Sequence, residues 1–373
     1  MKIERVRFGM LRVPLATPFK TSLRTVDEIA DVVVMVDTDD GRTGYGSAPA
    51  TAVITGDTHG SIIEAIHKVI APNIIGMEIG NLNAITDHIQ KSIIKNFSAK
   101  AAMEIAVYDL FGQLYGAPIY KLLGGGEDVI VTDITISVDY IDKMVEDAVA
   151  ACDAGFETLK VKVGKDPEMD IERIKAIYAA TDDRALIRLD ANQGWSPKQA
   201  VSVLRALEES GVQLELVEQP VLGEDIEGMK YVTERVHTPV MADESSFGPR
   251  EAIELIRNRA ADIINIKLMK TGGITNAVKI ADIAGIHGIE CMIGCMLESS
   301  IGVAAAAHVA AAKSTVITKV DLDTPSLGKY DPVTSGVRFE GAEIRITDAP
   351  GLGIENIDGL EPLDVANGAG RHC

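Results

Sequence analysis

Ala185-Leu-Ile-Arg-Leu-Asp-Ala-Asn192 decides the fold, because this short apolar run that ends in polar residues has counterparts all along the chain. Comparable runs of apolar and β-branched residues are centred near positions 134, 161, 188, 216, 241, 265, 291 and 318, at intervals of 24 to 28 residues. The first of them covers residues 130–138. Helical patterns fill the intervals, among them residues 144–154, 170–180, 197–210 and 275–284. Eight strands that alternate with helices predict an α/β fold, a parallel (β/α)8 barrel.

Residues 1–125 have a different pattern, which predicts an α+β domain ahead of the barrel. Apolar runs at 3–13 and 32–37 indicate strands of a hairpin, and helical patterns follow at 61–69, 83–94 and 99–115. Three consecutive glycines at 124–126 are typical of a linker. Proline and glycine interrupt the chain after residue 325. We therefore predict a barrel over residues 126–325 and a C-terminal segment, 326–373, that returns to the first domain.

The composition excludes several classes of partner. The 373 residues include 36 basic and 55 acidic side chains, which give a formal charge of −19. Nucleic acids and anionic membranes repel such a polyanion. The charged start, Met1 to Arg7, is unlike a signal peptide, and no apolar run reaches the ~18 residues that span a bilayer. The four cysteines include no pair spaced for a zinc site. We expect a soluble, cytoplasmic protein with reduced thiols.

Acidic residues end three consecutive predicted strands. Asp190, Glu218 and Asp243 close the third, fourth and fifth runs. In a (β/α)8 barrel the carboxyl ends of the strands converge on the active site, so these three carboxylates would meet there. Three hard oxygen ligands with free positions for water and substrate suit Mg²⁺. The alternative is that each acid caps the helix that follows its strand.

Two lysines flank the predicted metal site. Lys162 ends the second run and Lys267 the sixth, so in a ring of eight strands they face each other. A substrate whose carboxylate binds the metal would place its α-carbon between the two amines. One neutral lysine would remove the α-proton, and the opposite protonated lysine would return a proton to the other face. Lys160 would tune Lys162 or contact the substrate carboxylate. Alternatively, the lysines only pair with the acids.

These motifs resemble the enolase superfamily, in particular its muconate-lactonizing subgroup. The resemblance extends over nearly the whole chain and rests on Lys160-Val-Lys162, Asp190-Ala-Asn192, Val217-Glu-Gln-Pro220, Ala242-Asp-Glu-Ser245, Asn265-Ile-Lys267 and Gly294-Cys-Met-Leu-Glu298. It implies a modified (β/α)7β barrel, an N-terminal α+β capping domain completed by the C-terminal segment, and proton transfer through an enediolate beside Mg²⁺. Lysine at the sixth strand end separates the chain from the mandelate-racemase-like branch.

Within this subgroup, Asp321-Leu-Asp323 indicates the substrate. Two carboxylates on one face of the eighth strand would create a local charge of about −2, which suits a free ammonium group. This motif resembles that of dipeptide epimerases, where it holds the N-terminal ammonium of the substrate. The alternative is a pair of turn-capping acids before Pro325.

The same resemblance assigns further substrate contacts. Arg24, in a loop of the capping domain, would neutralise an acidic side chain of the substrate, or it would be a solvated loop residue. Thr135 and Cys295 would line the dipeptide site, with no nucleophilic role for the thiol. Asn192, Glu244 and Glu298, which also follow strand ends, would support the metal and the lysines.

The sequence thus predicts a Mg²⁺-dependent dipeptide epimerase that inverts the α-carbon of the C-terminal residue. Lys162 would act on the R form and Lys267 on the S form. Ala-Glu, as released in peptidoglycan recycling, is the favoured substrate, and broader or hydrophobic specificity stays open. Other hypotheses are an N-acylamino-acid racemase or o-succinylbenzoate synthase, and a catalytically silent small-molecule binding protein. The family commonly forms homo-oligomers, so we expect one here.

Overall fold

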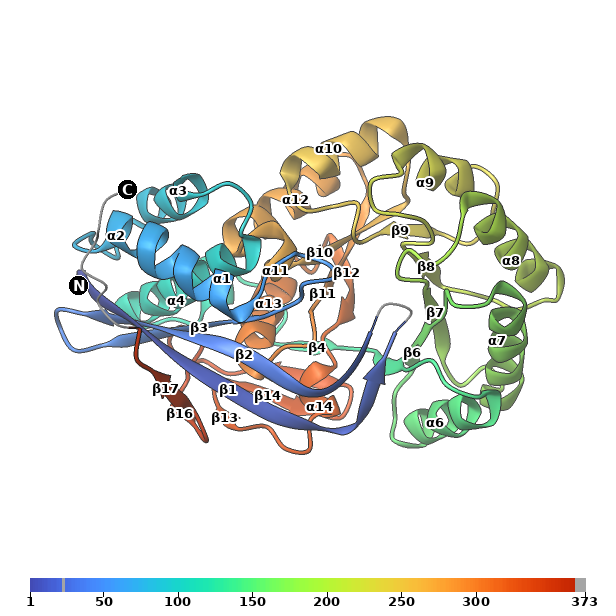
Figure 1. Cartoon of the computed structure of the whole chain (residues 1–373), viewed down its shortest axis with the longest axis horizontal. Coiled ribbons are helices and arrows are strands. Elements are labelled where there is room, and N and C mark those ends of the chain that lie inside the picture. The colour runs from blue at the N-terminus through green and yellow to red at the C-terminus, as the bar shows by residue number, and fades with distance from the viewer. Residues whose placement is uncertain (22–23, 366–373) are drawn as a thin grey trace.

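A parallel eight-stranded barrel forms the centre of the computed structural model, which describes residues 1–21 and 24–365 (Figure 1). Its strands neighbour one another in the order of the chain. The ring nearly closes where Asp133 N donates to Val320 O at 3.3 Å. The barrel strands are β5 (Ile134–Ile136), β6 (Thr158–Lys162), β7 (Leu186–Asp190), β8 (Leu216–Glu218), β9 (Val240–Ala242), β10 (Ile263–Lys267), β11 (Glu290–Gly294) and β12 (Ile317–Asp321). The predicted fold class is therefore confirmed.

Helices surround the outside of these strands (Figure 1). Two of those described, α7 and α8, begin with a side-chain cap followed by proline, at Asp166-Pro167 and Ser196-Pro197, and such caps satisfy the free N–H groups of a first turn. The helix after β12 is only one turn long and ends before Gly328, whose backbone is extended. The barrel helices are α6 (Ile141–Asp153), α7 (Pro167–Thr181), α8 (Pro197–Glu209), α9 (Ile226–Thr233), α10 (Pro249–Asn258), α11 (Leu268–Thr271), α12 (Ile274–Ile286), α13 (Ser300–Ala312) and α14 (Thr324–Leu327).

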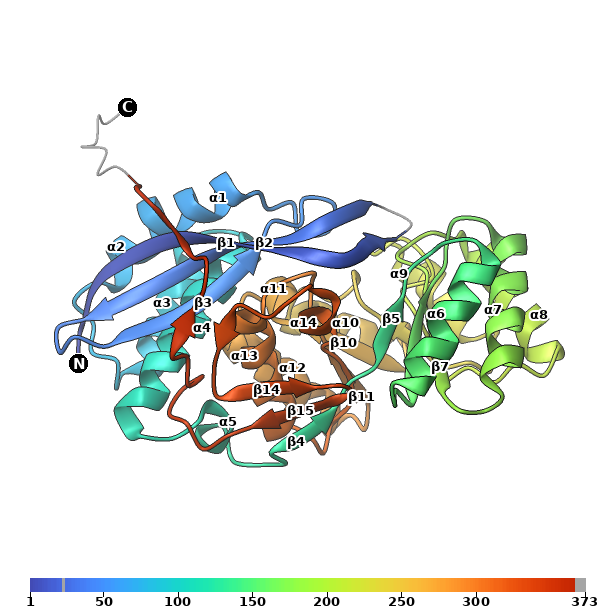
Figure 2. The same ribbon diagram turned by 90° about the horizontal axis from the view of Figure 1, so that it is seen from below.

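The N-terminal residues form an antiparallel sheet that lies beside the barrel (Figure 2). The hairpin is longer than predicted, and its far end reaches the barrel, where Lys20 N donates to Ser137 Oγ at 3.2 Å. The strands are β1 (Ile3–Lys20), β2 (Thr25–Thr38) and β3 (Thr43–Pro49). The accompanying helices are α1 (His59–Glu64), a π-helical segment (Ala65–Ile70), α2 (Ala71–Ile74), α3 (Leu82–Ser92), α4 (Phe97–Tyr115) and α5 (Ile119–Leu122).

The C-terminal segment joins both parts of the molecule. β17 (Glu361–Leu363) pairs with β1, while β14 (Val337–Glu340) and β15 (Glu343–Ile346) form a small sheet with β4 (Val129–Val131). β13 (Val333–Thr334) pairs with β16 (Asn356–Ile357). The prediction of one strand over residues 130–138 was wrong. The chain leaves the small sheet after Val131 and joins the barrel at Ile134. The domain boundaries at 125 and 325 stay a prediction.

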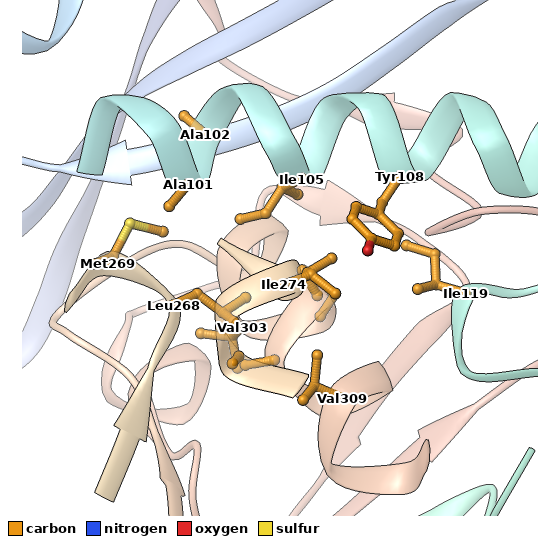
Figure 3. Close-up of a cluster of buried hydrophobic side chains, with 14 of the residues drawn as sticks. Ala101, Ala102, Ile105, Tyr108, Ile119, Leu268, Met269, Ile274, Val303 and Val309 are labelled. Carbon is orange, nitrogen blue, oxygen red and sulfur yellow. The ribbon is translucent and has the colours of Figure 1, made fainter. Parts of the chain in front are cut away.

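Helix α4 lies between the N-terminal sheet and the barrel and is buried almost all round. Gly44 and Gly46 of β3 let it approach, because a Cβ there would lie 2.2 and 2.0 Å from carbonyl oxygens of α4. On the barrel side, Ala101 and Ile105 pack near Met269 of α11 and Ile274 of α12 (Figure 3). This apolar contact anchors the capping elements directly behind the end of β10. No helix among the described residues is long and apolar enough to cross a membrane.

Candidate active site

The predicted site residues gather at the carboxyl ends of the barrel strands. Lys162, Asp190 and Glu218 end β6, β7 and β8, and they are neighbours in register. Asp243 follows β9, and Lys267 ends β10. All five residues are at least 94% buried. Because parallel strands end at one rim, the barrel converts positions that are far apart in sequence into one cluster.

A narrow cleft opens over this cluster, between the barrel and the capping elements. Lys162 and Lys267 both line it, from strands four places apart in the ring. The cleft thus offers two amines from opposite sides. Its remaining lining residues are Phe19, Thr21, Arg24, Val53, Ile54, Asn192, Cys295, Met296 and Leu297.

The two cleft lysines have different partners. Lys162 Nζ lies 2.6 Å from Asp190 Oδ2 and 5.8 Å from the centre of the Phe19 ring. Lys267 Nζ lies 2.8 Å from Asp243 Oδ2 and 3.7 Å from Glu218 Oε1. Burial lowers the pKa of Lys267, but the charges of Asp243 and Glu218 outweigh it and raise that pKa. Pairing with acids, the alternative role for these lysines, is therefore present together with access to the cleft.

Lys160 lies beneath the cleft rather than in its wall. Its Nζ is 2.6 Å from Asp321 Oδ2, 2.7 Å from Glu218 Oε2 and 3.1 Å from Asp190 Oδ2. Burial opposes its charge, yet these carboxylates raise the pKa of Lys160 well above its usual value. Lys160 is therefore a fixed cation that links the acids of three strands.

Asp190, Glu218 and Asp243 are the candidate ligands for Mg²⁺. Among residues 1–21 and 24–365, no three acidic, histidine or cysteine side chains are already grouped as a metal site, because lysine ammonium groups lie between them. Burial and the charge of Asp190 raise the pKa of Glu218 to about 7. Burial disfavours the charge of Asp190, but Lys162 and Lys160 lower its pKa.

Unsatisfied oxygens next to these carboxylates favour a cation. Both carboxylate oxygens of Glu244 are buried without a hydrogen-bond donor, and so is Asn265 Oδ1. Asn265 Nδ2 donates to Glu218 Oε1 at 2.7 Å. Buried acceptors without donors are rare unless water or an ion satisfies them. With a donor set made only of oxygens, the residues present fit Mg²⁺.

The acidic pair Asp321 and Asp323 differs from its prediction, because only Asp321 lies in β12 and Asp323 precedes α14. We expected a local charge of about −2, and this was wrong, because Lys160 pairs with Asp321. Asp323 Oδ2 instead accepts a hydrogen bond from Thr135 N at 2.7 Å. Burial and the charge of Asp321 raise the pKa of Asp323 to about 6. Asp323 therefore has no lysine ion-pair partner among the described residues, although neither acid lines the cleft wall.

Cys295 and Glu298 follow β11. Cys295 Sγ donates to Asp321 O at 3.4 Å, and burial raises the pKa of the Cys295 thiol, so it stays protonated. Glu298 Oε1 accepts from Met296 N at 2.9 Å, and burial with the charge of Asp31 raises the pKa of Glu298 to about 8. Glu298 thus shapes the loop that carries Cys295 and Met296 and does not contact the cleft lysines.

Arg24 lies at the capping side of the cleft. Its guanidinium forms no ion pair with any residue in the described part of the chain, and desolvation lowers its pKa. Its backbone N–H donates to Thr21 Oγ1 at 3.2 Å. The neighbouring residues 22 and 23 of the predicted loop lie outside the described residues, as does Cys373.

Three residues of the site were missed by sequence reasoning. Phe19 reaches Lys162 from β1, and no local signal marks it. Gln219 Oε1 accepts from Asp243 N at 2.8 Å and from Ser245 N at 3.1 Å, so it joins the ends of β8 and β9. Lys270 is completely buried against Asp243. Its signal was a charged residue three positions after Lys267 in an apolar run.

Comparisons with known proteins agree with this architecture. Residues 5–124 match the mandelate racemase / muconate lactonizing enzyme N-terminal domain, and residues 143–358 match the enolase C-terminal domain-like family. An L-Ala-D/L-Glu epimerase of Clostridium acetobutylicum is 50% identical over 96% of this chain and 100% of its own length.

Solved structures of epimerases are also similar to this chain. A substrate-liganded L-Ala-D/L-Glu epimerase of Bacillus subtilis has a TM-score of 0.94 and 47% identity, over 96% of this chain and 99% of its own. A dipeptide epimerase of Enterococcus faecalis, complexed with Mg and L-Leu-L-Tyr, has a TM-score of 0.92 and 44% identity, over 95% and 100%. The chain therefore belongs to the enolase superfamily and, within it, to the family of mandelate racemase and muconate-lactonizing enzymes.

Proposed function

We propose that this chain is a Mg²⁺-dependent dipeptide epimerase, an isomerase that inverts the α-carbon of the C-terminal residue. The observation that carries the proposal is the pair of amines, Lys162 and Lys267, on opposite sides of one cleft beside three carboxylates. Relatives of 44–50% identity that are named as dipeptide epimerases support it.

Asp190, Glu218 and Asp243 would hold the metal at the floor of the cleft. When bound, Mg²⁺ supplies positive charge that stabilises the negative charge developing on the substrate carboxylate. Lys162 removes or returns the α-proton on the face of the R form, and Lys267 does so on the face of the S form. Each lysine is held at a carboxylate, so its Nζ is already positioned before substrate arrives.

The α-ammonium of the substrate binds next to Asp323, whose position is fixed by Thr135 N. Asp321 contributes less negative charge, because Lys160 neutralises it. Cys295 lines the wall between this acid pair and the cleft. An N-acylated substrate would leave Asp323 without a cation, which disfavours an N-acylamino-acid racemase.

The side chain of the C-terminal residue meets Arg24. A half-buried guanidinium without an ion pair in the described residues suits a substrate carboxylate, and this favours Ala-Glu. The apolar neighbours Val53, Ile54, Met296 and Leu297 favour a second candidate, hydrophobic dipeptides, such as the one bound by the Enterococcus faecalis relative. Arg24→Met should raise KM for Ala-Glu and leave KM for Ala-Leu nearly unchanged.

We further propose a cytoplasmic homo-oligomer that acts on peptides from peptidoglycan recycling. The three cysteines in the described part of the chain are unpaired, which fits a reducing compartment. The preference for Ala-Glu suits peptides of that origin.

Deuterium exchange tests the proposal. The protein with Mg²⁺ is incubated in D₂O with L-Ala-L-Glu, L-Ala-D-Glu and a wider dipeptide set, and the α-hydrogen is followed by NMR. We expect loss of the α-proton signal and formation of the epimer, both abolished by EDTA. N-acetyl-L-Ala-L-Glu serves as the control and should not react. Binding without exchange would support the silent binding protein, and equal turnover of the acetylated peptide would support the racemase.

A further inference from the structure

One ionisable side chain beside the site has no role in this mechanism. Lys270 lies in α11, three residues after Lys267, and is 0% exposed. It does not line the cleft, so it does not reach a substrate. An ammonium group that is removed from water destabilises a fold unless it is fully paired, and its presence therefore calls for a reason.

The ammonium of Lys270 is surrounded by three oxygens. Its Nζ donates hydrogen bonds to Asp243 O and, at 3.0 Å, to Asn265 O. It also forms an ion pair with Asp243 Oδ1 at 2.5 Å. The two carbonyl oxygens accept two of the three ammonium protons, and Asp243 Oδ1 is attracted to the ammonium by its charge. Lys270 therefore links the residue that follows β9 to the middle of β10.

The two oxygens of Asp243 consequently have different surroundings. Oδ1 lies against Lys270 in the protein interior, whereas Oδ2 lies 2.8 Å from Nζ of Lys267, which lines the cleft. Only Oδ2 is thus next to the cleft. The orientation of the carboxylate decides which oxygen Lys267 meets.

Packing holds Lys270 in this position. Its neighbours in α11, Leu268 and Met269, are buried next to Ala101 of α4 (Figure 3). Gln90 of the capping region donates to Gly272 O at 2.6 Å and closes the other end of α11. The capping elements therefore fix the turn that carries Lys270.

We propose that Lys270 is a positioning residue for Lys267. It occupies Oδ1 of Asp243, so that the carboxylate offers Oδ2 alone to the cleft, and this sets the place of the Lys267 ammonium. The inference rests on the proposed function in one respect, namely that Lys267 transfers the proton of the S form. It also predicts that Asp243 binds a metal through one oxygen.

The test compares the two stereoisomers in one preparation of enzyme. Lys270→Met shortens the unbranched side chain by one atom and removes its charge. Exchange in D₂O is measured from L-Ala-L-Glu, the S form, and from L-Ala-D-Glu, the R form. We expect exchange from the S form to fall about 10- to 100-fold more than exchange from the R form, since a small displacement of one reacting group has effects of this size. Mg²⁺ affinity, measured by calorimetry, should not weaken, because a cation next to a ligand has been removed.

The matched control is Lys100→Met. Lys100 is also buried but contacts the Phe97 ring and has no ion pair within the described residues. This variant should keep the wild-type ratio of the two rates. An equal fall of both rates in Lys270→Met, or no change of their ratio, would overturn the proposal, because a merely structural role affects both isomers.

If Lys270→Met does not fold, a second measurement, on the wild-type protein, tests the proposal. In a crystal structure of the wild-type protein with Mg²⁺, Lys270 should remain on Oδ1 of Asp243. Coordination of the metal by both oxygens of Asp243, or displacement of Lys270, would contradict the proposal. Failure of the proposed function is distinguishable, since the wild-type protein would then exchange neither isomer.

Discussion

The two halves of the cleft hold their lysines in different ways. Lys162, on β6, has one carboxylate partner, Asp190, and faces the Phe19 ring of the capping strand β1. Lys267, on β10, has two carboxylate neighbours and is backed by Lys270, whose turn packs against the capping helix α4. The capping region therefore reaches one lysine through a strand and the other through a helix. Changes in one half should affect one stereoisomer.

Exchanging each lysine for alanine should give the largest effect. We expect Lys162→Ala to lower exchange from the R form, and Lys267→Ala from the S form, by about 10²- to 10⁴-fold, as is usual for loss of a general base. Each variant serves as the control for the other when both isomers are assayed by NMR. Loss of the same isomer in both variants would show that the two halves do not serve opposite faces.

Stability should depend on pH through the helix that backs the Lys267 half. Glu104 of α4 accepts from Thr275 N at 2.8 Å, and burial raises its pKa to about 7 from 4.5. The folded state holds this proton more tightly, so the contribution to stability is complete below pH 4.5 and is lost as pH rises through 7. Glutamine does not titrate, so Glu104→Gln should not show this loss. In the wild-type protein the loss amounts to up to about 3 kcal/mol of the free energy of unfolding. Urea unfolding of both proteins at pH 5 and pH 8 measures the difference.

The substitution Glu104→Gln can also change the free energy of unfolding by the same amount at every pH, and such a constant difference from the wild-type protein does not bear on this prediction. The prediction concerns how the difference in unfolding free energy between the two proteins changes from pH 5 to pH 8. An offset that is the same at pH 5 and pH 8 would mean that Glu104 titrates normally.

The acid pair Asp321 and Asp323, at and just after the end of β12, belongs to neither half, so its change should affect both isomers alike. Asp323→Asn should raise KM for both forms of Ala-Glu about 10- to 100-fold, the usual cost of losing a charged hydrogen bond. Steady-state kinetics of both isomers check this. A strong preference for one isomer in this variant would break the separation between amine binding and proton transfer.

Phe19→Leu should give the smallest effect, limited to the Lys162 half. A cation–π contact of this kind changes rates about 2- to 10-fold when it is removed. Exchange from the R form should fall by this factor and exchange from the S form should not. An equal fall of the two exchange rates would show that Phe19 closes the whole cleft and does not act on Lys162 alone.

Much of this arrangement followed from the sequence. Strand spacing gave the barrel, and because barrel strands end at one rim, Asp190, Glu218 and Asp243 could be placed together without coordinates. The same logic placed Lys162 opposite Lys267. Regular repeats are readable because each strand and helix repeats the same local pattern.

The remainder depends on contacts between distant segments. Phe19 meets Lys162 only because the β1–β2 hairpin is long enough to reach the barrel. Lys160 neutralises Asp321 across the barrel interior, so the charge of the acid pair could not be counted from its own strand. The split near residue 132 arises from a small sheet that the C-terminal segment completes. No local pattern encodes these partners.

Isotope labelling of the first turnover tests the central claim, two amines on opposite faces of one α-carbon. L-Ala-L-Glu is incubated with enzyme and Mg²⁺ in D₂O, and the earliest product is analysed by mass spectrometry and NMR. We predict that newly formed L-Ala-D-Glu carries deuterium at the α-carbon while the remaining substrate still carries protium. Early product that retains the substrate's own α-proton would contradict the account, because a single group would then serve both faces.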